Sequence, residues 1–386
     1  MTSSAFITGV GGTAMGHLPQ SSCMSLHREA TIAAVTDAGL TLADIDGVLC
    51  AYSFTQPHLM LASWFSEYCG LHPGVCFAIQ AGGATAATMV AQAASLVASG
   101  QCRHVLLVTG DNRLSGLSRD GAVSALATVG HREFEQPFGV SVPASYALVA
   151  ARYMHEYGTT SEELAGVAVA MRKHAARHPS AHMRSLITVN DVTASRLIAS
   201  PLRLLDCSLI SDGGCALVVS GREAARDQRH VPIAIAGIGH GHTHEHLISA
   251  PSLTSFGCAQ SAAQAMARAG VAPADIDVAA IYDSFTITLI VELECMGFFQ
   301  RGEAGGAALR GELDLTGKLP CNTHGGLLSH GHPGAAGGMF HIHEAVLQLR
   351  GTASVRQVAN ADLAFVHGDG GILSAHCSLV LARGVN

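Results

Sequence analysis

The sequence predicts an α/β fold built from two copies of one unit, and two observations support this. Short apolar runs typical of buried strands alternate with longer segments of helical character, which is the order of an α/β layered protein. In addition, the stretch from Ala34 to Thr55 aligns without a gap on the stretch from Ala265 to Thr286, at a constant offset of 231. A duplicated α/β unit is therefore expected.

The first unit begins with AFITGVGG, which predicts a buried strand ending in a glycine turn, and a helix is expected from His27 to Leu40. The ADID and SFT elements then coincide in the two aligned stretches. Further along, the segment from Phe77 to Gly100 pairs with the segment that ends at Gly351, so that Gly83 falls opposite Gly334. We therefore expect an N-terminal half over residues 1–225 and a C-terminal half over residues 226–386.

An excursion of about residues 113–200 interrupts the first half. It contains two helix-like stretches and is too long for a plain connection between a strand and a helix. We expect it to cover the active site or to shape a substrate channel.

Composition and charge exclude several classes of function. The 386 residues include 48% hydrophobic and 13% charged residues, which is typical of a densely packed enzyme. The net charge of −7 and the lack of a Lys/Arg cluster argue against nucleic acid or an anionic membrane as partner. The chain shows no secretory signal or spanning segment, and its eleven cysteines lack a CxxC pair, so free thiols in a reducing cytoplasm are expected.

The stretch from Leu319 to Gly351 carries the clearest chemical signal. Small residues and three histidines, His324, His330 and His332, lead through Pro333 into a helical pattern. Proline suits the first turn of a helix, and the N–H groups there can hold developing negative charge. We expect an exposed loop that feeds a buried helix and forms the floor of an active site.

Three segments carry a resemblance to a known family. They are NTHGGLLSHGHPGAAGG from Asn322, PLRLLDCSLISDGGCALVVS from Pro201 and YDSFTITLIVELECMGFF from Tyr282. Over essentially its full length the chain resembles the thiolase superfamily, most closely the branch of lipid-transfer-protein and sterol-carrier-protein-associated thiolases. The resemblance implies a thiolase-like fold of two duplicated halves in five alternating α/β layers, assembled as a homodimer, with a role in lipid metabolism.

The resemblance also implies a set of site positions. The histidine of the Gly-His-Pro motif is His332, Tyr282 precedes the Asp-x-Phe core of a catalytic motif, and His367 occupies the position of a second cysteine. The position of the nucleophilic cysteine falls on Gly83, or on Ala81 in an alternative placement. Neither residue can form a thioester, so the usual acyl-enzyme step is not available there.

Other cysteines do not replace the missing nucleophile. Cys76 would need a register shift that spoils the repeat, and Cys69, Cys102 and Cys207 are interpreted as buried structural residues. What remains is a site with acid–base groups and oxyanion donors. This favours retro-aldol cleavage of a β-hydroxyacyl-CoA, in which the thioester enolate is stabilised and a ketone or aldehyde leaves.

The expected catalytic residues are Tyr282, His332 and His367. The expected substrate contacts are Gly83, Asn322, Asp369 and Gly370. Coenzyme A is expected as part of the substrate, with no tightly bound cofactor. Similar enzymes that cleave steroid side chains commonly work with a small OB-fold and zinc-ribbon protein, so the resemblance implies such a partner subunit here.

Two other functions remain open from the sequence. An acyltransferase or retro-Claisen thiolase could use another nucleophile, a partner subunit or free CoA, and an inactive homologue could bind acyl chains or stabilise a partner. A separate cluster, His240, His242, His244 and His246, alternates along a predicted strand and could hold a metal. A solvated or channel-lining loop is the favoured interpretation, so no metal site is expected.

Overall fold

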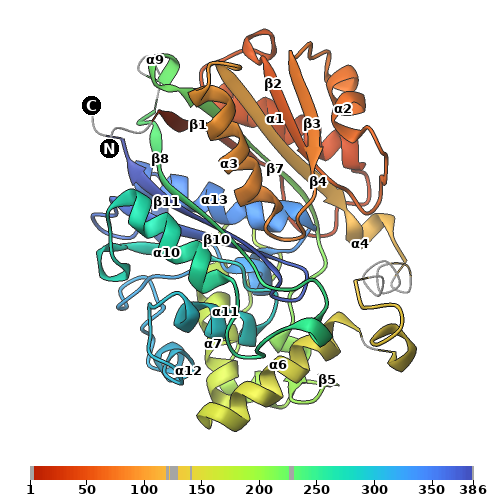
Figure 1. Ribbon diagram of the computed structural model, residues 1–386, viewed down its shortest axis with the longest axis vertical. Helices are drawn as coiled ribbons and strands as arrows, with labels where there is room; N and C mark the ends of the chain where they lie inside the picture. The colour runs from red at the N-terminus through yellow and green to blue at the C-terminus, as the bar shows by residue number, and fades with distance from the viewer. Residues whose placement is uncertain (1–3, 119–120, 122–128, 140, 226–229, 385–386) are drawn as a thin grey trace.

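The computed structural model describes residues 4–118, 121, 129–139, 141–225 and 230–384. Nine strands cross the centre of the molecule, and helices lie on both faces (Figure 1). Their order in the sheet is β3-β2-β4-β7-β1-β8-β11-β10-β9. The predicted α/β class is therefore confirmed.

The first five strands of this order belong to the N-terminal half. Strand β2 pairs in parallel with β3 and β4, while β4 pairs antiparallel with β7, and β7 antiparallel with β1. The strand bounds are β1 Ala5–Gly12, β2 Gly47–Ala51, β3 Val75–Ile79, β4 His104–Asn112 and β7 Asp212–Gly221.

The four C-terminal strands β9, β10, β11 and β8 repeat the arrangement of β2, β4, β7 and β1. Strand β9 pairs in parallel with β10, β10 pairs antiparallel with β11, and β11 pairs antiparallel with β8. The two sets meet where β1 pairs with β8, through Phe6 with Ala234 and Ile7 with Ile233. The bounds are β8 Ile233–His242, β9 Val278–Ile281, β10 Leu363–Gly370 and β11 Ala375–Arg383. The same order and sense of pairing in both sets confirm the duplication; residues 226–229, at the predicted boundary, lie outside the described part of the chain.

Helices complete the five layers. One outer layer holds α1 (Cys23–Asp37) and α2 (Leu61–Cys69), and the opposite one holds α10 (Cys258–Ala269) and α11 (Thr286–Cys295). Between the two sets of strands lie α3 (Thr85–Ala98) and α13 (Ala335–Arg350), whose apolar side chains share one core with strands of both halves. The layered thiolase-like architecture expected from the sequence is confirmed.

The excursion after β4 forms a helical cap on the C-terminal half. Its longest helices are α6 (Val142–Tyr157) and α7 (Ser161–Ala176), and both contact α11. The shorter elements are α4 Arg113–Gly116, η2 Gln136–Phe138, α8 Val189–Thr193, β5 Leu197–Ala199 and β6 Leu202–Arg203. Positions 119–120 and 122–128 of this excursion lie outside the described residues.

The remaining elements are short. They are η1 Leu42–Asp44, η3 Leu204–Asp206, α9 Arg222–Ala225, η4 Leu247–Ser249, η5 Pro273–Asp275, α12 Ala304–Leu309, the π-helical turn η6 Gly326–His330 and η7 Ser354–Arg356. No helix in the described part of the chain is long and apolar enough to cross a bilayer.

Candidate active site

Tyr282 and His332 form a hydrogen-bonded pair at the centre of the molecule. Tyr282 follows β9 directly, and its Oη lies 3.0 Å from Nε2 of His332. The backbone N–H of Tyr282 donates to the carbonyl of His367 at 3.1 Å, which holds the residue beside β10. Two of the residues predicted as catalytic are thus brought together.

Two serines orient the ring of His332. Ser208 Oγ lies 3.1 Å from Nδ1, and Ser211 Oγ accepts from the backbone N–H of His332 at 3.2 Å. Burial, the Arg113 cation and His341 lower the pKa of His332 to about 3, while burial raises the pKa of Tyr282 well above its ordinary value. The resting pair is therefore a neutral phenol and a neutral imidazole that share the hydrogen bond between Oη and Nε2.

Gly83 lies against the ring of Tyr282. A β-carbon at position 83 would come within 2.2 Å of Cζ of Tyr282 and 2.1 Å of the carbonyl oxygen of Asp369. Such distances are far below van der Waals contact, so even alanine would displace the ring. The space that a nucleophile would need at position 83 is occupied by the tyrosine ring.

The starts of α3 and α13 face each other around this ring. A β-carbon on Gly338, in the first turns of α13, would lie 2.8 Å from the carbonyl oxygen of Gly83 and 3.7 Å from Cε2 of Tyr282. The helix start at Gly334 and its twin near Gly83 are thus opposed in space, as the repeat predicts.

The loop before α13 is buried, which corrects the expectation of an exposed one. His324 and His330 are 2% and 1% exposed, and their rings contact each other, while His324 also contacts His341. Asp283 Oδ1 accepts from the backbone N–H of Leu327 at 2.7 Å and so fixes the turn η6. Of the three histidines in this loop, it is His332 that forms the hydrogen bond with the tyrosine.

Asn322 supports the site from behind. It is fully buried, its Oδ1 accepts from the N–H of Ile281 at 2.7 Å, and its amide nitrogen donates to the Ile281 carbonyl at 2.8 Å. It therefore positions the end of β9, and Tyr282 with it. A direct contact between Asn322 and substrate stays a prediction.

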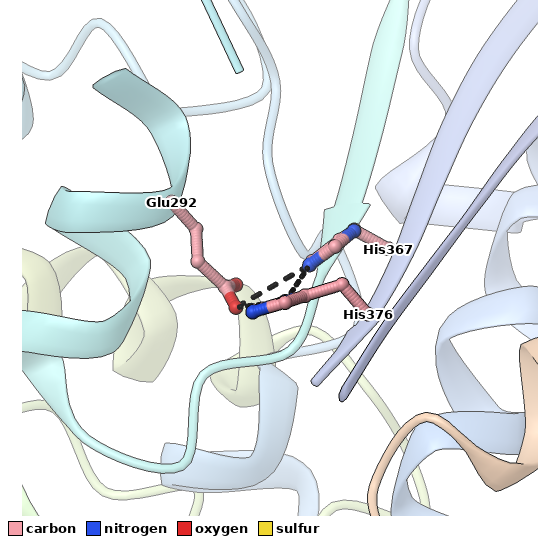
Figure 2. Close-up of side chains that lie close together, drawn as sticks. All are labelled: Glu292, His367 and His376. Carbon is pink, nitrogen blue, oxygen red and sulfur yellow. Dashed lines mark hydrogen bonds and ion pairs between the residues drawn. The ribbon is translucent and has the colours of Figure 1, made fainter. Parts of the chain in front are cut away.

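His367 joins a second cluster and not the Tyr282–His332 pair. Its Nδ1 lies 2.8 Å from Oγ of Ser378, and its Nε2 lies 3.1 Å from Nδ1 of His376 and 3.4 Å from Oε1 of Glu292. Figure 2 shows the two rings and the carboxylate turned toward one another. The His367 ring is therefore engaged in this second cluster, and its catalytic role stays a prediction.

Asp369 and Gly370 lie between the two clusters. The Asp369 carboxylate accepts from the hydroxyl of Tyr146 on α6 at 3.0 Å, while its carbonyl faces Gly83. A β-carbon on Gly370 would lie 2.1 Å from the carbonyl of Ala81, so the two glycine-containing loops abut. Contacts of Gly83, Asp369 and Gly370 with substrate stay predictions.

An open cleft of about 360 Å³ lies beside the loop at Ala81 and the start of β11. Its lining residues are Ala81, Ala84, Thr88, His240, Gly241, His242, Gln260, Ala375 and His376. His240 and His242 are exposed on its wall, whereas His244 is buried and bonded to the carbonyl of Ile372 at 3.1 Å. The alternating histidines therefore differ in burial and do not form one cluster. Within the described ranges, the group of side chains that could hold a metal ion is instead Glu292, His367 and His376.

Sequence reasoning missed Arg113. Its side chain is buried, its guanidinium lies 4.8 Å from the centre of the Phe54 ring, and its Nε has no hydrogen-bond partner among the described residues. It also approaches Gly334 at the start of the His332 helix. In the sequence, the feature that could have indicated Arg113 is its place as a single cationic residue directly after the buried strand β4.

The cysteines provide no replacement nucleophile next to Tyr282. The cysteines of the described chain are free thiols, as expected. Cys102 is buried, but Cys69 and Cys207 are only partly so, which corrects the expectation for these two. Burial raises the pKa of Cys207 to about 12, so its thiol stays protonated, and Cys76 lies on the edge strand β3.

Comparisons with known proteins agree with this architecture. Residues 239–383 match the family described as thiolase C-terminal domain-like. The chain is 38% identical to a steroid side-chain-cleaving aldolase of Thermomonospora curvata, covering 90% of this chain and 91% of the relative. It is 34% identical to an acetyl-CoA acetyltransferase of Methanothermobacter thermautotrophicus, over 96% and 98% of the two chains.

Solved structures agree as well. The structure of an Ltp2-ChsH2(DUF35) aldolase matches with a TM-score of 0.86 and 36% identity over 98% of both chains. Human mitochondrial 3-ketoacyl-CoA thiolase shares the fold, with a TM-score of 0.76 at 15% identity over 99% of both chains. The chain belongs to the thiolase superfamily, in its branch associated with sterol carrier protein 2.

Proposed function

We propose that this protein is a CoA-dependent carbon–carbon lyase that cleaves a β-hydroxyacyl-CoA by a retro-aldol reaction. One observation carries the proposal: the ring of Tyr282 fills the space beside Gly83, where a nucleophile would stand, and its hydroxyl is hydrogen-bonded to His332. In place of a nucleophile that attacks carbon, the site therefore holds a pair of side chains that can transfer protons.

The pair suits removal of the proton from the β-hydroxyl group. As the substrate hydroxyl gives its proton to Tyr282 Oη, the phenol proton passes to Nε2 of His332, 3.0 Å away. The electrons of the O–H bond form the C=O bond of the leaving ketone or aldehyde. The Cα–Cβ bond breaks, and its electron pair moves onto the thioester to give an enolate.

The proton then returns and closes the cycle. Tyr282 gives the proton that it took from the substrate to the enolate carbon, which completes a shortened acyl-CoA, and His332 returns the phenol proton to Tyr282. Backbone N–H groups around Gly83 are the proposed donors to the enolate oxygen, and Arg113 adds a buried positive charge near the start of α13. No acyl group is transferred to the enzyme in this sequence.

Relatives support a bulky substrate and a second subunit. One is named steroid side-chain-cleaving aldolase, and another, 35% identical and from Mycobacterium tuberculosis, is named 17-hydroxy-3-oxo-4-pregnene-20-carboxyl-CoA lyase. The name of the Ltp2-ChsH2(DUF35) aldolase includes two components. We therefore propose a β-hydroxyacyl-CoA whose leaving carbonyl is large, and a small OB-fold and zinc-ribbon protein as partner in the cytoplasm.

We also propose a homodimer formed through β3. This strand is at one end of the sheet order, and Phe77 on it is 38% exposed. An edge strand with an exposed aromatic side chain offers unpaired backbone groups and apolar surface to a second copy.

The experiment compares two substrates, with and without the partner subunit. A β-hydroxyacyl-CoA should release a ketone or aldehyde together with a shorter acyl-CoA. A β-ketoacyl-CoA incubated with free CoA should remain intact, and its thiolysis would support the acyltransferase alternative instead. Tyr282→Phe should lower kcat by about 10²–10⁴-fold, the usual contribution of general acid–base catalysis.

Tyr68→Phe is the matched control, because Tyr68 is 49% exposed on α2 and the change removes a phenol oxygen far from the pair in the fold. Equal turnover by Tyr282→Phe, His332→Gln and Tyr68→Phe would show that the assigned pair is not the catalytic one. Absence of turnover in all combinations, with the partner present, would favour the acyl-binding homologue.

A further inference from the structure

The direction of one hydrogen-bond chain determines which nitrogen of His367 carries its proton. The hydroxyl of Ser261 donates to the carbonyl of Cys258 at 3.0 Å, so it can only accept in its 2.8 Å contact with Ser378 Oγ. Ser378 therefore donates there, and must accept from His367 Nδ1 at 2.8 Å. A neutral His367 ring consequently presents a lone pair at Nε2.

His376 is fixed in the complementary way. Its Nε2 lies 2.9 Å from the carbonyl of Leu373, to which it can only donate. A neutral His376 ring thus carries its lone pair at Nδ1, which lies 3.1 Å from His367 Nε2. Two lone pairs at this distance repel each other unless a cation lies between them.

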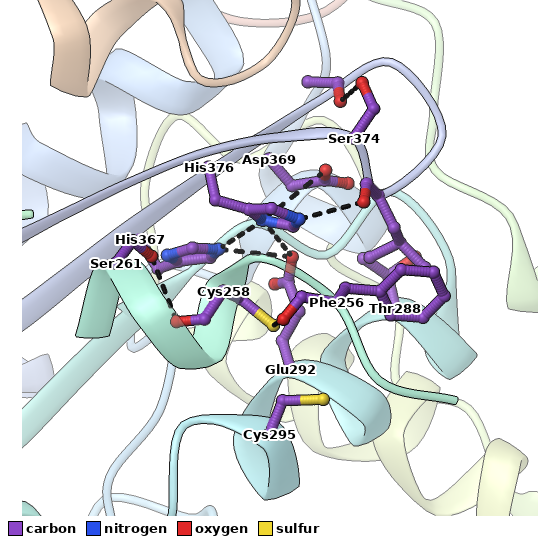
Figure 3. Close-up of polar contacts among 12 residues, drawn as sticks. Phe256, Cys258, Ser261, Thr288, Glu292, Cys295, His367, Asp369, Ser374 and His376 are labelled. Atoms are coloured by element: carbon purple, nitrogen blue, oxygen red, sulfur yellow. Dashed lines mark hydrogen bonds and ion pairs between the residues drawn. The ribbon is translucent and has the colours of Figure 1, made fainter. Parts of the chain in front are cut away.

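Carboxylate oxygens without hydrogen-bond partners face the same point. Both carboxylate oxygens of Glu292 and Oδ1 of Asp369 are buried. None of these three atoms has a hydrogen-bond partner among the described residues. Glu292 Oε1 lies 3.4 Å from His367 Nε2 and 4.0 Å from His376 Nδ1, and Asp369 Oδ1 lies 3.9 Å from His376 Nδ1. Figure 3 shows these groups converging from β10, β11 and α11.

We propose that Glu292, His367 and His376 bind a divalent transition-metal ion of the zinc type, with Asp369 beside it. Ligands of tetrahedral zinc at about 2.0–2.1 Å lie about 3.3 Å from one another. The three ligand atoms, which all lie within 4.8 Å of one another, approach that spacing. Two imidazoles and a carboxylate are also a donor set that zinc prefers.

The surroundings fit a metal site beyond the ligands. Metal-bound histidines usually donate their other ring N–H to a carbonyl or an oxygen, and here Ser378 and Leu373 take those protons. His376 also lines the open cleft together with the exposed His240 and His242, which gives the ion a route to the cluster.

The ion would stabilise the ends of β10 and β11. These strand ends carry the Asp369 carbonyl and Gly370, which abut the loop at Ala81 to Gly83. The lyase steps proposed above do not involve the ion, so the metal site is a separate proposal that its own experiment tests.

The test is metal analysis of this chain alone, prepared without a histidine tag and separated from any zinc-containing partner. After chelator treatment, the protein is titrated with Zn²⁺ and, separately, with Co²⁺. We expect one ion per chain, a Co²⁺ visible spectrum of tetrahedral or five-coordinate type, and an anomalous scattering peak at the zinc edge between the three ligand atoms.

Variants separate this cluster from the cleft histidines. Glu292→Gln and His376→Gln should weaken Zn²⁺ binding at least tenfold, whereas the matched control with both His240→Gln and His242→Gln should bind as the unaltered protein does. Absence of bound metal at micromolar Zn²⁺, or loss of binding in the control alone, would overturn the proposal. If Glu292→Gln fails to fold, the presence or absence of the anomalous peak in the unaltered protein decides whether the metal site exists.

Discussion

A side chain at position 83 and the ring of Tyr282 would compete for the same space. The side chain would overlap ring carbons and the Asp369 carbonyl, and the carbonyl belongs to a strand that cannot easily move. The absence of a nucleophile at position 83 and the presence of the Tyr282 ring are therefore coupled, because both depend on the same space. Reversing either change alone should damage the site.

Gly83→Cys should consequently fail to produce a thiolase. We expect the new β-carbon to displace Tyr282, to lower lyase activity at least tenfold and to destabilise the fold by about 1–3 kcal/mol, as overpacking does. Thiolysis of a β-ketoacyl-CoA, lyase turnover and urea unfolding measure the three effects. Ala81→Cys, which adds a thiol two residues away on the cleft wall, is the control for folding; a stable Gly83→Cys protein with thiolase activity would contradict the assignment.

The pH dependence of the reaction also belongs to a single residue. Burial and the Arg113 cation lower the pKa of His332 to about 3, so the ring stays neutral across the range in which an ordinary histidine titrates. We expect kcat to show no loss through pH 6.5 on the acid side. The prediction would be wrong if kcat fell on the acid side with a midpoint near pH 6.5 and if this fall disappeared in His332→Gln.

At the scale of elements, α13 is anchored by a buried ion pair that also holds the loop before it. Glu344 on α13 accepts from Arg356 Nε at 3.0 Å and from Arg356 Nη2 at 2.9 Å, and its Oε1 also accepts from Thr323 at 2.8 Å. Thr323 follows Asn322, so this network fixes the segment that positions Tyr282. The proposed catalytic geometry is therefore expected to depend on contacts of α13 beyond its first turns.

Arg356→Ala should test this anchor. Removing one partner leaves a buried carboxylate without its cation, which typically costs about 3–5 kcal/mol of unfolding free energy. The control is Arg310→Ala, because Arg310 pairs with Glu312 at 2.7 Å while its side chain is 63% exposed, and such surface pairs contribute about 0–1 kcal/mol. Urea unfolding of both variants should give clearly different midpoints, and equal midpoints would argue against the anchor.

The edge strand β3 is the second element with a testable consequence. Phe77→Asp places a charge on the exposed side chain of an edge strand, where desolvation opposes pairing with another copy. We expect the homodimer to dissociate into folded monomers in sedimentation velocity. Phe138→Asp, at an aromatic residue that is 77% exposed outside the sheet, is the control and should sediment as a dimer; an unchanged dimer in Phe77→Asp would place the contact elsewhere.

For the whole molecule, buried histidines link stability to pH. Burial lowers the pKa of His27 to about 4 and that of His341 to about 3. The unfolded chain, with histidines near 6.5, then binds more protons than the folded one below that pH, so stability is present above about 6.5 and is lost as pH falls toward 3–4. The melting temperature at constant ionic strength should fall steadily below pH 6.5, and a flat curve down to pH 4 would contradict it.

Much of the fold could be predicted because its evidence is local. The aligned segments carry the same order of strands and helices in both halves, and strand order, pairing sense and the opposed starts of α3 and α13 follow that repeat. Loop burial could not be predicted in this way. The polar run around His324 and His330 packs inside because Asp283 and His341 reach it from other segments.

The sequence by itself determined the duplicated α/β architecture and the prediction of Gly83, Tyr282 and His332 as site positions, because motifs and repeats are linear patterns. Only the tertiary structure decided that the tyrosine ring takes the vacated space, that Ser208 orients His332, and that His367 turns toward Glu292 and His376. These contacts join segments distant in sequence, and side-chain direction depends on strand register and helix packing, which no local pattern specifies.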